Sequence, residues 1–148
     1  MLYLRYMRFL IAFLALSTPA YTWEFTSGLP CLLSHETSEA KIELTYDPTQ
    51  PLYSLTISRA QPWAETPSFG MRFDGPQGRA IGTDRHVLNA DRSALTVTDR
   101  AFGNVLDGLQ YNHTATAIAG DLEIAFPLER ASGPVAAFRA CEGAPLAS

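Results

Sequence analysis

The sequence predicts an α+β domain that is mostly β: a small antiparallel sheet or sandwich with two or three short helices, the C-terminal one packed on the sheet. Short segments of alternating apolar and polar residues predict about six or seven strands. Turn-forming residues separate these segments by short connections, which favours antiparallel neighbours. Helical spacing of apolar residues occurs only in the last third of the chain. Together these three observations indicate a single β-rich domain.

The clearest strands form a predicted hairpin. In KIELTY (41–46) and LYSLTIS (52–58) every second residue is apolar, as a half-buried strand requires. The residues between them, DPTQP (47–51), are typical of a turn. A second hairpin is predicted from SFGMRF (68–73) and RAIGT (79–83), which flank the turn sequence DGPQG.

Two helical segments and one strand are expected next. TDRHVLNA (83–90) predicts a short helical turn capped by Thr83 or Asp84. ALTVT (94–98) predicts a strand. The same tripeptide, T-D-R, recurs at 98–100 and predicts a cap for a second helix. The apolar residues at helical spacing in that helix are Phe102, Val105, Leu106 and Leu109.

The C-terminal third predicts a hairpin followed by a helix. TATAIAGDLEIAF (114–126) indicates two strands that meet at Gly120 and Asp121. Pro134 suits a first helical turn, so we expect a short helix over VAAFRAC (135–141) that lies across the sheet. The residues predicted to face inward are Leu122, Ile124 and Phe126 on the strand, and Val135 and Phe138 on the helix.

The N-terminus is typical of an export signal. Arg5 and Arg8 precede an apolar run over 9–16, and small residues precede a predicted cleavage site after Ala20. The apolar run is much shorter than the roughly 20 residues that a membrane-spanning helix needs. We therefore predict a signal peptide over 1–20, a single exported domain over 21–148 and no stable membrane insertion after cleavage.

The two cysteines, Cys31 and Cys141, are predicted to form a disulfide. Thiols outside the cytoplasm meet oxidising machinery, and an even pair there tends to form a bridge. The alternative is a pair of metal or redox ligands, but the chain has no C-x-x-C motif and no histidine at zinc-finger spacing from either cysteine. The predicted bridge fastens the C-terminal helix to the N-terminal segment.

Charge composition disfavours nucleic acid as a partner. The chain has 11 basic and 15 acidic residues, and loss of Arg5 and Arg8 with the signal peptide leaves a formal charge of minus six. Nucleic-acid affinity comes from clustered Lys and Arg that neutralise phosphates. Here the arginines are scattered singly and Lys41 is the only lysine.

Two pairs of residues are candidates for catalysis. Asp84 and His86 place a carboxylate two residues from an imidazole, and His35 and Glu36 form the second pair. The alternative interpretation is a helix cap beside a surface histidine, which we favour because the chain lacks a nucleophile elbow. The spacing of His35, His86 and His113 has no metal-ligand pattern, so we predict no metal and no cofactor.

Trp63 is a candidate binding residue. It lies in the loop QPWAE, where an exposed ring would contact a peptide or a sugar. The alternative is that its ring closes one end of the core, which is the usual fate of tryptophan. Farther along, Asn112, His113 and Thr114 match a glycosylation acceptor.

Three segments carry a resemblance to a known family. They are PCLLSHE (30–36), NVLDGL (104–109) followed by a strand, and FPLERASGPVAAFRAC (126–141). In these segments the chain resembles the invasion-associated locus B family of exported Gram-negative proteins. That family usually has more cysteines, and its central cysteine motif has no counterpart between Phe69 and Leu95. The resemblance implies a periplasmic location and a β-rich fold, and no site residues.

Two functions from different classes follow from these observations. The first is a periplasmic or secreted, non-catalytic interaction or accessory domain, whose partner is an unidentified envelope protein or peptide. The second is a small hydrolase or metal-assisted enzyme that uses Asp84 and His86, with His35 or Glu36. The second function requires these distant residues to converge in one pocket. The sequence favours the interaction domain and does not set the oligomeric state.

Overall fold

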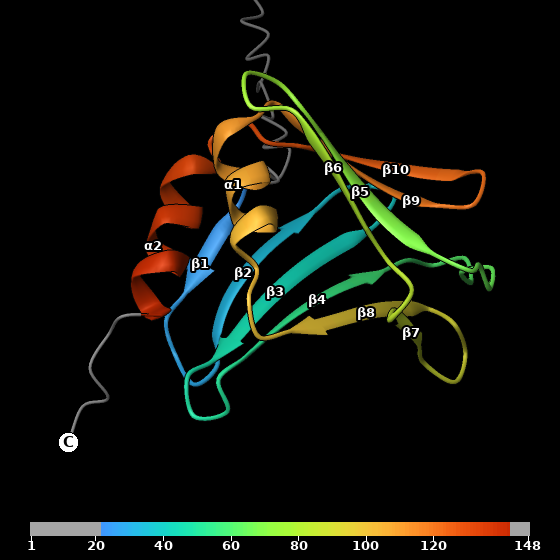
Figure 1. Ribbon diagram of the computed structural model, residues 1–148, viewed down its shortest axis with the longest axis horizontal. Helices are drawn as coiled ribbons and strands as arrows, with labels where there is room; N and C mark the ends of the chain where they lie inside the picture. The colour runs from blue at the N-terminus through green and yellow to red at the C-terminus, as the bar shows by residue number, and fades with distance from the viewer. Residues whose placement is uncertain (1–21, 143–148) are drawn as a thin grey trace, which may run out of the picture.

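The computed structural model describes residues 22–142, which form ten strands and two helices (Figure 1). The predicted signal peptide over 1–20 and the predicted mature start at residue 21 lie outside this range. Within it, neither helix is long and apolar enough to cross a membrane. The elements are β1 (Glu24–Thr26), β2 (Cys31–Glu36), β3 (Lys41–Asp47), β4 (Leu52–Ser58), β5 (Phe69–Asp74), β6 (Arg79–Thr83), β7 (Val87–Leu88), β8 (Ala94–Asp99), α1 (Gly103–Tyr111), β9 (Thr114–Ala119), β10 (Leu122–Pro127) and α2 (Ser132–Glu142).

The strands form two antiparallel sheets. One sheet has six strands in the order β1-β2-β3-β4-β8-β7, and the other has four in the order β10-β9-β5-β6. The sheets lie one above the other, and both helices lie together at one end of the molecule (Figure 1). α2 packs against β1, β2 and α1. The predicted mostly-β fold, with antiparallel strands and a C-terminal helix packed on the sheet, is confirmed.

The predicted hairpin of residues 41–58 is present as β3 and β4. Alternation places one face of each strand in the core, so that buried residues pair directly across the strands. The turn is held by the Asp47 carboxylate, which accepts hydrogen bonds from the Thr49 amide at 2.9 Å and from Gln50 Nε2 at 2.9 Å. The buried cross-strand pairs are Ile42–Ile57, Leu44–Leu55 and Tyr46–Tyr53.

The second predicted hairpin is present as β5 and β6, and Asn112 holds its turn. The buried Asn112 amide accepts a hydrogen bond from the Gln77 backbone N–H and donates one to the Gln77 carbonyl, both at 2.9 Å. It also donates to the carbonyl of Gly108 at 3.0 Å. The turn is therefore tied to the end of α1. The amide of the glycosylation motif is occupied by these bonds within the fold.

Two predicted helix caps are wrong. Residues 83–90 form no helix; instead β7 pairs with β8 and satisfies its backbone groups there. α1 begins after Phe102, which makes no side-chain cap. Asp99 lies at the end of β8 and accepts hydrogen bonds from the amides of Arg100 and Ala101, in the turn that precedes the helix. A short polar side chain stabilises a turn by the same bonds that it uses in a cap.

Strands β1 and β2 were not predicted. β2 lies inside the six-stranded sheet, between β1 and β3. Its buried residues are Cys31, Leu33 and His35, which alternate with more exposed ones. The period-2 signal is present in this segment, but a cysteine and a histidine carry two of its three inward positions.

The C-terminal helix is fastened to the six-stranded sheet. Val135 and Phe138 are buried as predicted, and Cys141 forms the predicted disulfide with Cys31, their Cα atoms 6.6 Å apart. Arg139 pairs with Asp107 of α1 and donates to Gln110 Oε1 at 3.0 Å. These contacts connect α2 to α1 as well as to β2.

Gly108 allows α1 to approach the four-stranded sheet closely. We therefore expect an alanine at position 108 to destabilise the folded protein. A Cβ atom at Gly108 would lie closer than 3.0 Å to three ring atoms of the buried Phe73. We expect Gly108→Ala to lower the free energy of unfolding by about 1–3 kcal/mol through overpacking, as measured by urea denaturation. Gly103→Ala, in the same helix with nothing within 4 Å, is the matched control. That variant should be neutral or more stable by up to about 1 kcal/mol. Equal effects at both positions would contradict the close approach.

Candidate functional site

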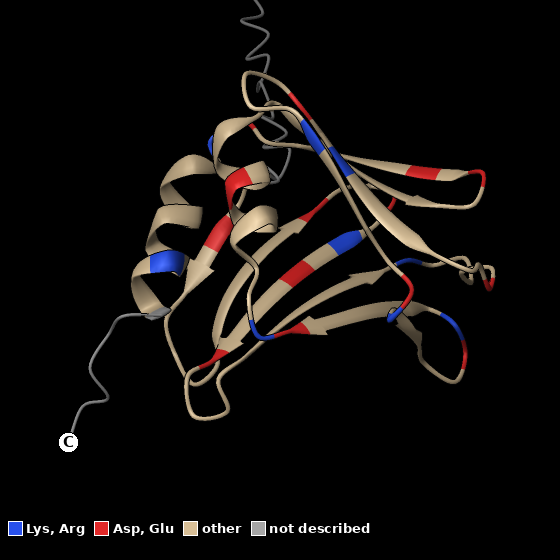
Figure 2. Ribbon diagram, viewed as in Figure 1, with Lys and Arg blue, Asp and Glu red and all other residues tan. Residues whose placement is uncertain are grey.

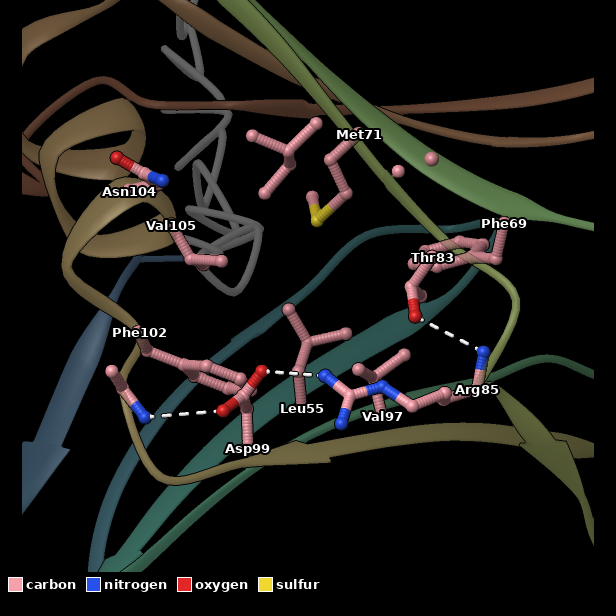
Figure 3. A pocket seen from close by; sticks show the side chains of 14 residues that line it. Leu55, Phe69, Met71, Thr83, Arg85, Val97, Asp99, Phe102, Asn104 and Val105 are labelled. Atoms are coloured by element: carbon pink, nitrogen blue, oxygen red, sulfur yellow. Dashed lines mark hydrogen bonds and ion pairs between the residues drawn. The ribbon is translucent and has the colours of Figure 1, made fainter.

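A partly open cavity of about 190 Å³ lies between the two sheets, next to the start of α1 (Figure 3). Its walls are mainly apolar, and polar residues lie near its opening. Such a composition is typical of a binding pocket. The apolar lining residues are Leu55, Phe69, Met71, Ile81, Val97, Ala101, Phe102 and Val105, and the polar ones are Thr83, Arg85, Asp99 and Asn104.

The strand registers build the cavity walls. On the six-stranded sheet, Leu55 of β4 pairs directly with Val97 of β8. On the four-stranded sheet, Met71 of β5 pairs with Ile81 of β6. The facing side chains of these two pairs form opposite walls. A pair of glycines, Gly70 and Gly82, also lines the cavity.

An ion pair spans the opening of the cavity. The Arg85 Nη2 atom lies 2.9 Å from Asp99 Oδ2, so the pair joins the segment after β6 to the end of β8 (Figure 3). Each partner makes a further hydrogen bond: the Arg85 backbone N–H donates to Thr83 Oγ1 at 3.0 Å, and the Asp99 carboxylate accepts from the Arg100 backbone N–H at 2.6 Å. The backbone hydrogen bond from Arg100, with that from Ala101 and the charge of Arg85, lowers the pKa of Asp99.

Solvent exposure makes this ion pair easy to open. The Arg85 side chain is 69% exposed and that of Asp99 is 39% exposed. Exposed ion pairs contribute about 0–1 kcal/mol, because water screens the charges and ordering long side chains costs entropy. A charged group of a ligand is therefore able to displace one partner of the Arg85–Asp99 ion pair at the cavity opening.

Charges elsewhere on the described residues are interspersed. Figure 2 shows that basic and acidic residues are mixed with one another along the strands and in the loops of both sheets. Arg72, for example, lies 3.1 Å from Asp74 and 3.2 Å from Glu123. The cavity opening follows the same pattern, with one arginine beside one aspartate.

The structure separates the two candidate catalytic pairs. Asp84 is exposed, and His86 Nε2 lies 3.1 Å from the carbonyl oxygen of Thr66. His35 and Glu36 end β2, whereas His86 directly precedes β7, near the other edge of the same sheet. Four strand spacings, about 19 Å in all, separate β2 from β7. The described residues also contain no group of three or more His, Cys, Asp or Glu side chains that could hold a metal.

His35 is buried in an aromatic environment. It is 6% exposed, and its ring stacks on that of Trp23 with centroids 4.9 Å apart and planes 8° apart. The Nδ1 atom of His35 is buried and has no hydrogen-bond partner. Burial lowers the pKa of His35, and a hydrogen bond with the Thr22 backbone partly opposes that effect. The residue is therefore neutral in the folded protein near pH 7.

Trp63 is part of the core. Its side chain is fully buried, Nε1 donates to the Ile57 carbonyl at 3.1 Å, and the Phe69 ring meets it edge-on. The guanidinium of Arg59 lies 5.5 Å from the ring centroid. The Trp63 ring is therefore part of the core, which was the sequence-based alternative to a binding role. It offers no exposed surface to a peptide or a sugar.

In the sequence, the two residues at the cavity opening belong to the segments that predict helix caps. Arg85 ends the first T-D-R tripeptide, and Asp99 lies in the middle of the second. The recurrence of this tripeptide was the available signal. The pairing of the two residues depends on how the sheets face each other, which local sequence does not encode.

Comparison with protein-family models, with curated proteins and with solved structures gave no match. The resemblance to the invasion-associated locus B family therefore stays a prediction.

The buried His35 predicts a pH-dependent stability. In the unfolded chain this residue takes up a proton near its ordinary pKa of 6.5, whereas the folded protein resists protonation because the ring is buried. We expect the free energy of unfolding to fall as the pH drops below about 6.5, since the unfolded state then binds more protons. The measurement is urea denaturation at a series of pH values.

Two histidine variants identify the source of this pH dependence. His35→Phe retains an aromatic ring against Trp23 and should lose part of the dependence. His113→Gln, at an exposed position, should retain it. An unchanged pH slope in His35→Phe would contradict this assignment.

Proposed function

We propose that this protein is an exported, non-catalytic interaction domain that binds an envelope protein or peptide and is stapled by one disulfide. The cavity between the two sheets is the observation that carries this proposal. Ligand-binding pockets are concave and mostly apolar, with a few polar groups that orient the ligand. A cavity of about 190 Å³ is of the size that accepts one large apolar side chain.

The position of β6 supports a peptide as the ligand. β6 is an edge strand of the four-stranded sheet, and its residues Ile81 and Thr83 line the cavity. An edge strand presents backbone N–H and C=O groups to which an extended segment can pair. A segment paired along β6 would place a side chain at the cavity opening. Backbone pairing then supplies affinity, and the cavity supplies selectivity.

The chain's sequence and its disulfide support an exported location. The layout of residues 1–20 is typical of a signal peptide. Structural disulfides such as Cys31–Cys141 persist mainly in oxidising compartments. The periplasm or the extracellular space is the proposed site of action.

The enzymatic alternative is not proposed. It required Asp84 and His86 to meet His35 or Glu36, and the strand order places the two pairs near opposite edges of the six-stranded sheet. Neither Asp84 nor His86 lines the cavity between the sheets. The arrangement of the candidate residues gives no specific support to a hydrolytic or metal-assisted reaction.

The experiment fills the cavity and compares partner capture. The oxidised domain is immobilised and exposed to an envelope extract from the source organism. Val97→Phe adds bulk to the cavity wall and should abolish capture of the specific partner. Val87→Phe makes the same substitution at a residue that is 65% exposed and does not line the cavity, so it should capture as the wild type does. Equal capture by all three proteins, each shown to be folded by circular dichroism, would overturn the proposal.

A further inference from the structure

The chemistry at the cavity opening indicates which group of a partner the cavity accepts. We propose that it binds the C-terminus of a polypeptide that ends in an aromatic residue: the ring enters the cavity, and the terminal carboxylate displaces Asp99 from Arg85. This inference rests on the proposed function and adds the chemical class of the ligand to it. It follows from the size of the cavity, from its apolar walls and from the donors of Arg85.

The volume and the lining select the apolar part of the ligand. A cavity of about 150 Å³ lined by aliphatic and aromatic side chains holds one benzene molecule. The present cavity, at about 190 Å³, has room for a phenyl ring and the methylene that carries it. Its deeper walls include Leu55, Met71 and Phe102, all of them nearly fully buried. A charged group has no partner at these walls, so it would remain at the opening.

Arg85 selects the charged part. A guanidinium has five N–H donors in a planar fork that matches a carboxylate in a two-point contact. The structure records one hydrogen bond from this guanidinium, to Asp99 at 2.9 Å. Because the side chain is 69% exposed, it can rotate from Asp99 to an incoming carboxylate at small cost. Arg85 is thus the positive group at the cavity opening that complements a ligand carboxylate.

The edge strand distinguishes a peptide from a small acid. In a C-terminal phenylalanine the ring and the carboxylate are separated by two carbon atoms, as they are in 3-phenylpropionate. Both ligands would fill the cavity and meet Arg85. Only the peptide has backbone groups that can pair with β6, whose residues Ile81 and Thr83 line the cavity. We therefore expect the peptide to bind more tightly than the acid.

Isothermal titration calorimetry with three probes tests the inference. The probes are acetyl-Gly-Gly-Phe with a free carboxylate, the same peptide with a C-terminal amide, and 3-phenylpropionate. The wild type should bind the peptide acid about tenfold more tightly than the peptide amide, because charge-assisted hydrogen bonds are lost with the amide. It should also bind the peptide acid more tightly than 3-phenylpropionate.

Two variants at the ion pair should change the affinity in opposite directions. Arg85→Gln should lower the affinity for the peptide acid by about tenfold and remove the preference over the amide. Asp99→Asn keeps an oxygen that can accept from the amides of Arg100 and Ala101, but it removes the charge that competes for Arg85. It should raise the affinity for the peptide acid by about two- to fivefold. If the ion pair had only a structural role, both variants would change the affinity for the peptide acid in the same direction.

The possible failures are distinct. Equal affinity for the acid and the amide, or no binding of either peptide by the wild type, would overturn the recognition of a C-terminus. Equal or tighter binding of 3-phenylpropionate would identify a small acid as the ligand and overturn the peptide. Each of these results leaves the capture experiment with Val97→Phe and Val87→Phe to decide the proposed function by itself. Binding of the peptide acid that persists unchanged in Val97→Phe would place this ligand outside the cavity and would overturn the inference, whereas the capture experiment would still decide the proposed function.

Discussion

The disulfide between Cys31 and Cys141 is the constraint on which the helical end of this domain depends. It joins the last turn of α2 to the start of β2, over a sequence separation of 110 residues. Closing a loop of that length removes about 4–5 kcal/mol of entropy from the unfolded chain in the simplest account. α2 has only 11 residues, and a helix of that length is marginal in water without tertiary contacts. The bridge therefore fixes a helix that would otherwise be attached only by the packing of Val135 and Phe138 and by the contacts of Arg139 with α1.

The effect of the disulfide extends from α2 to the cavity. Arg139 of α2 pairs with Asp107 of α1, and Asp107 also lies 3.8 Å from Arg79 of β6. Phe102, which precedes α1, stacks on Tyr53, and Val105 lines the cavity beside it. The position of α1 thus sets one wall of the cavity, and α2 supports α1. The Cys31–Cys141 disulfide lies outside the cavity, but through α2 and α1 it helps to define the cavity's shape.

The sequence predicted those parts of the fold that local patterns specify. Alternating residues identified β3 and β4, and the spacing from Phe102 to Leu109 identified α1, because each pattern reports burial of one face of one element. β2 escaped prediction since Cys31 and His35 occupy inward positions where apolar residues are usual. The cap predicted at 98–100 failed because the Asp99 side chain bonds to amides in a turn instead of a helix, and the cap predicted at Thr83 or Asp84 failed because the residues after it form β7. The cavity and its ion pair were beyond prediction from local patterns, since Arg85 and Asp99 meet only when two separate sheets face each other.

Amide hydrogen exchange, compared between the oxidised wild type and the double variant Cys31→Ala/Cys141→Ala, tests the role of the disulfide most directly. In the variant, amides of α2 and then of α1 should lose protection, because the attachment of α2 weakens and local opening becomes cheaper than global unfolding. Amides of β3 and β4, in the middle of the six-stranded sheet, should remain protected under the same native conditions. Equal protection of both helices in the two proteins would contradict the account, because it would show that packing alone holds α2 and α1 in place.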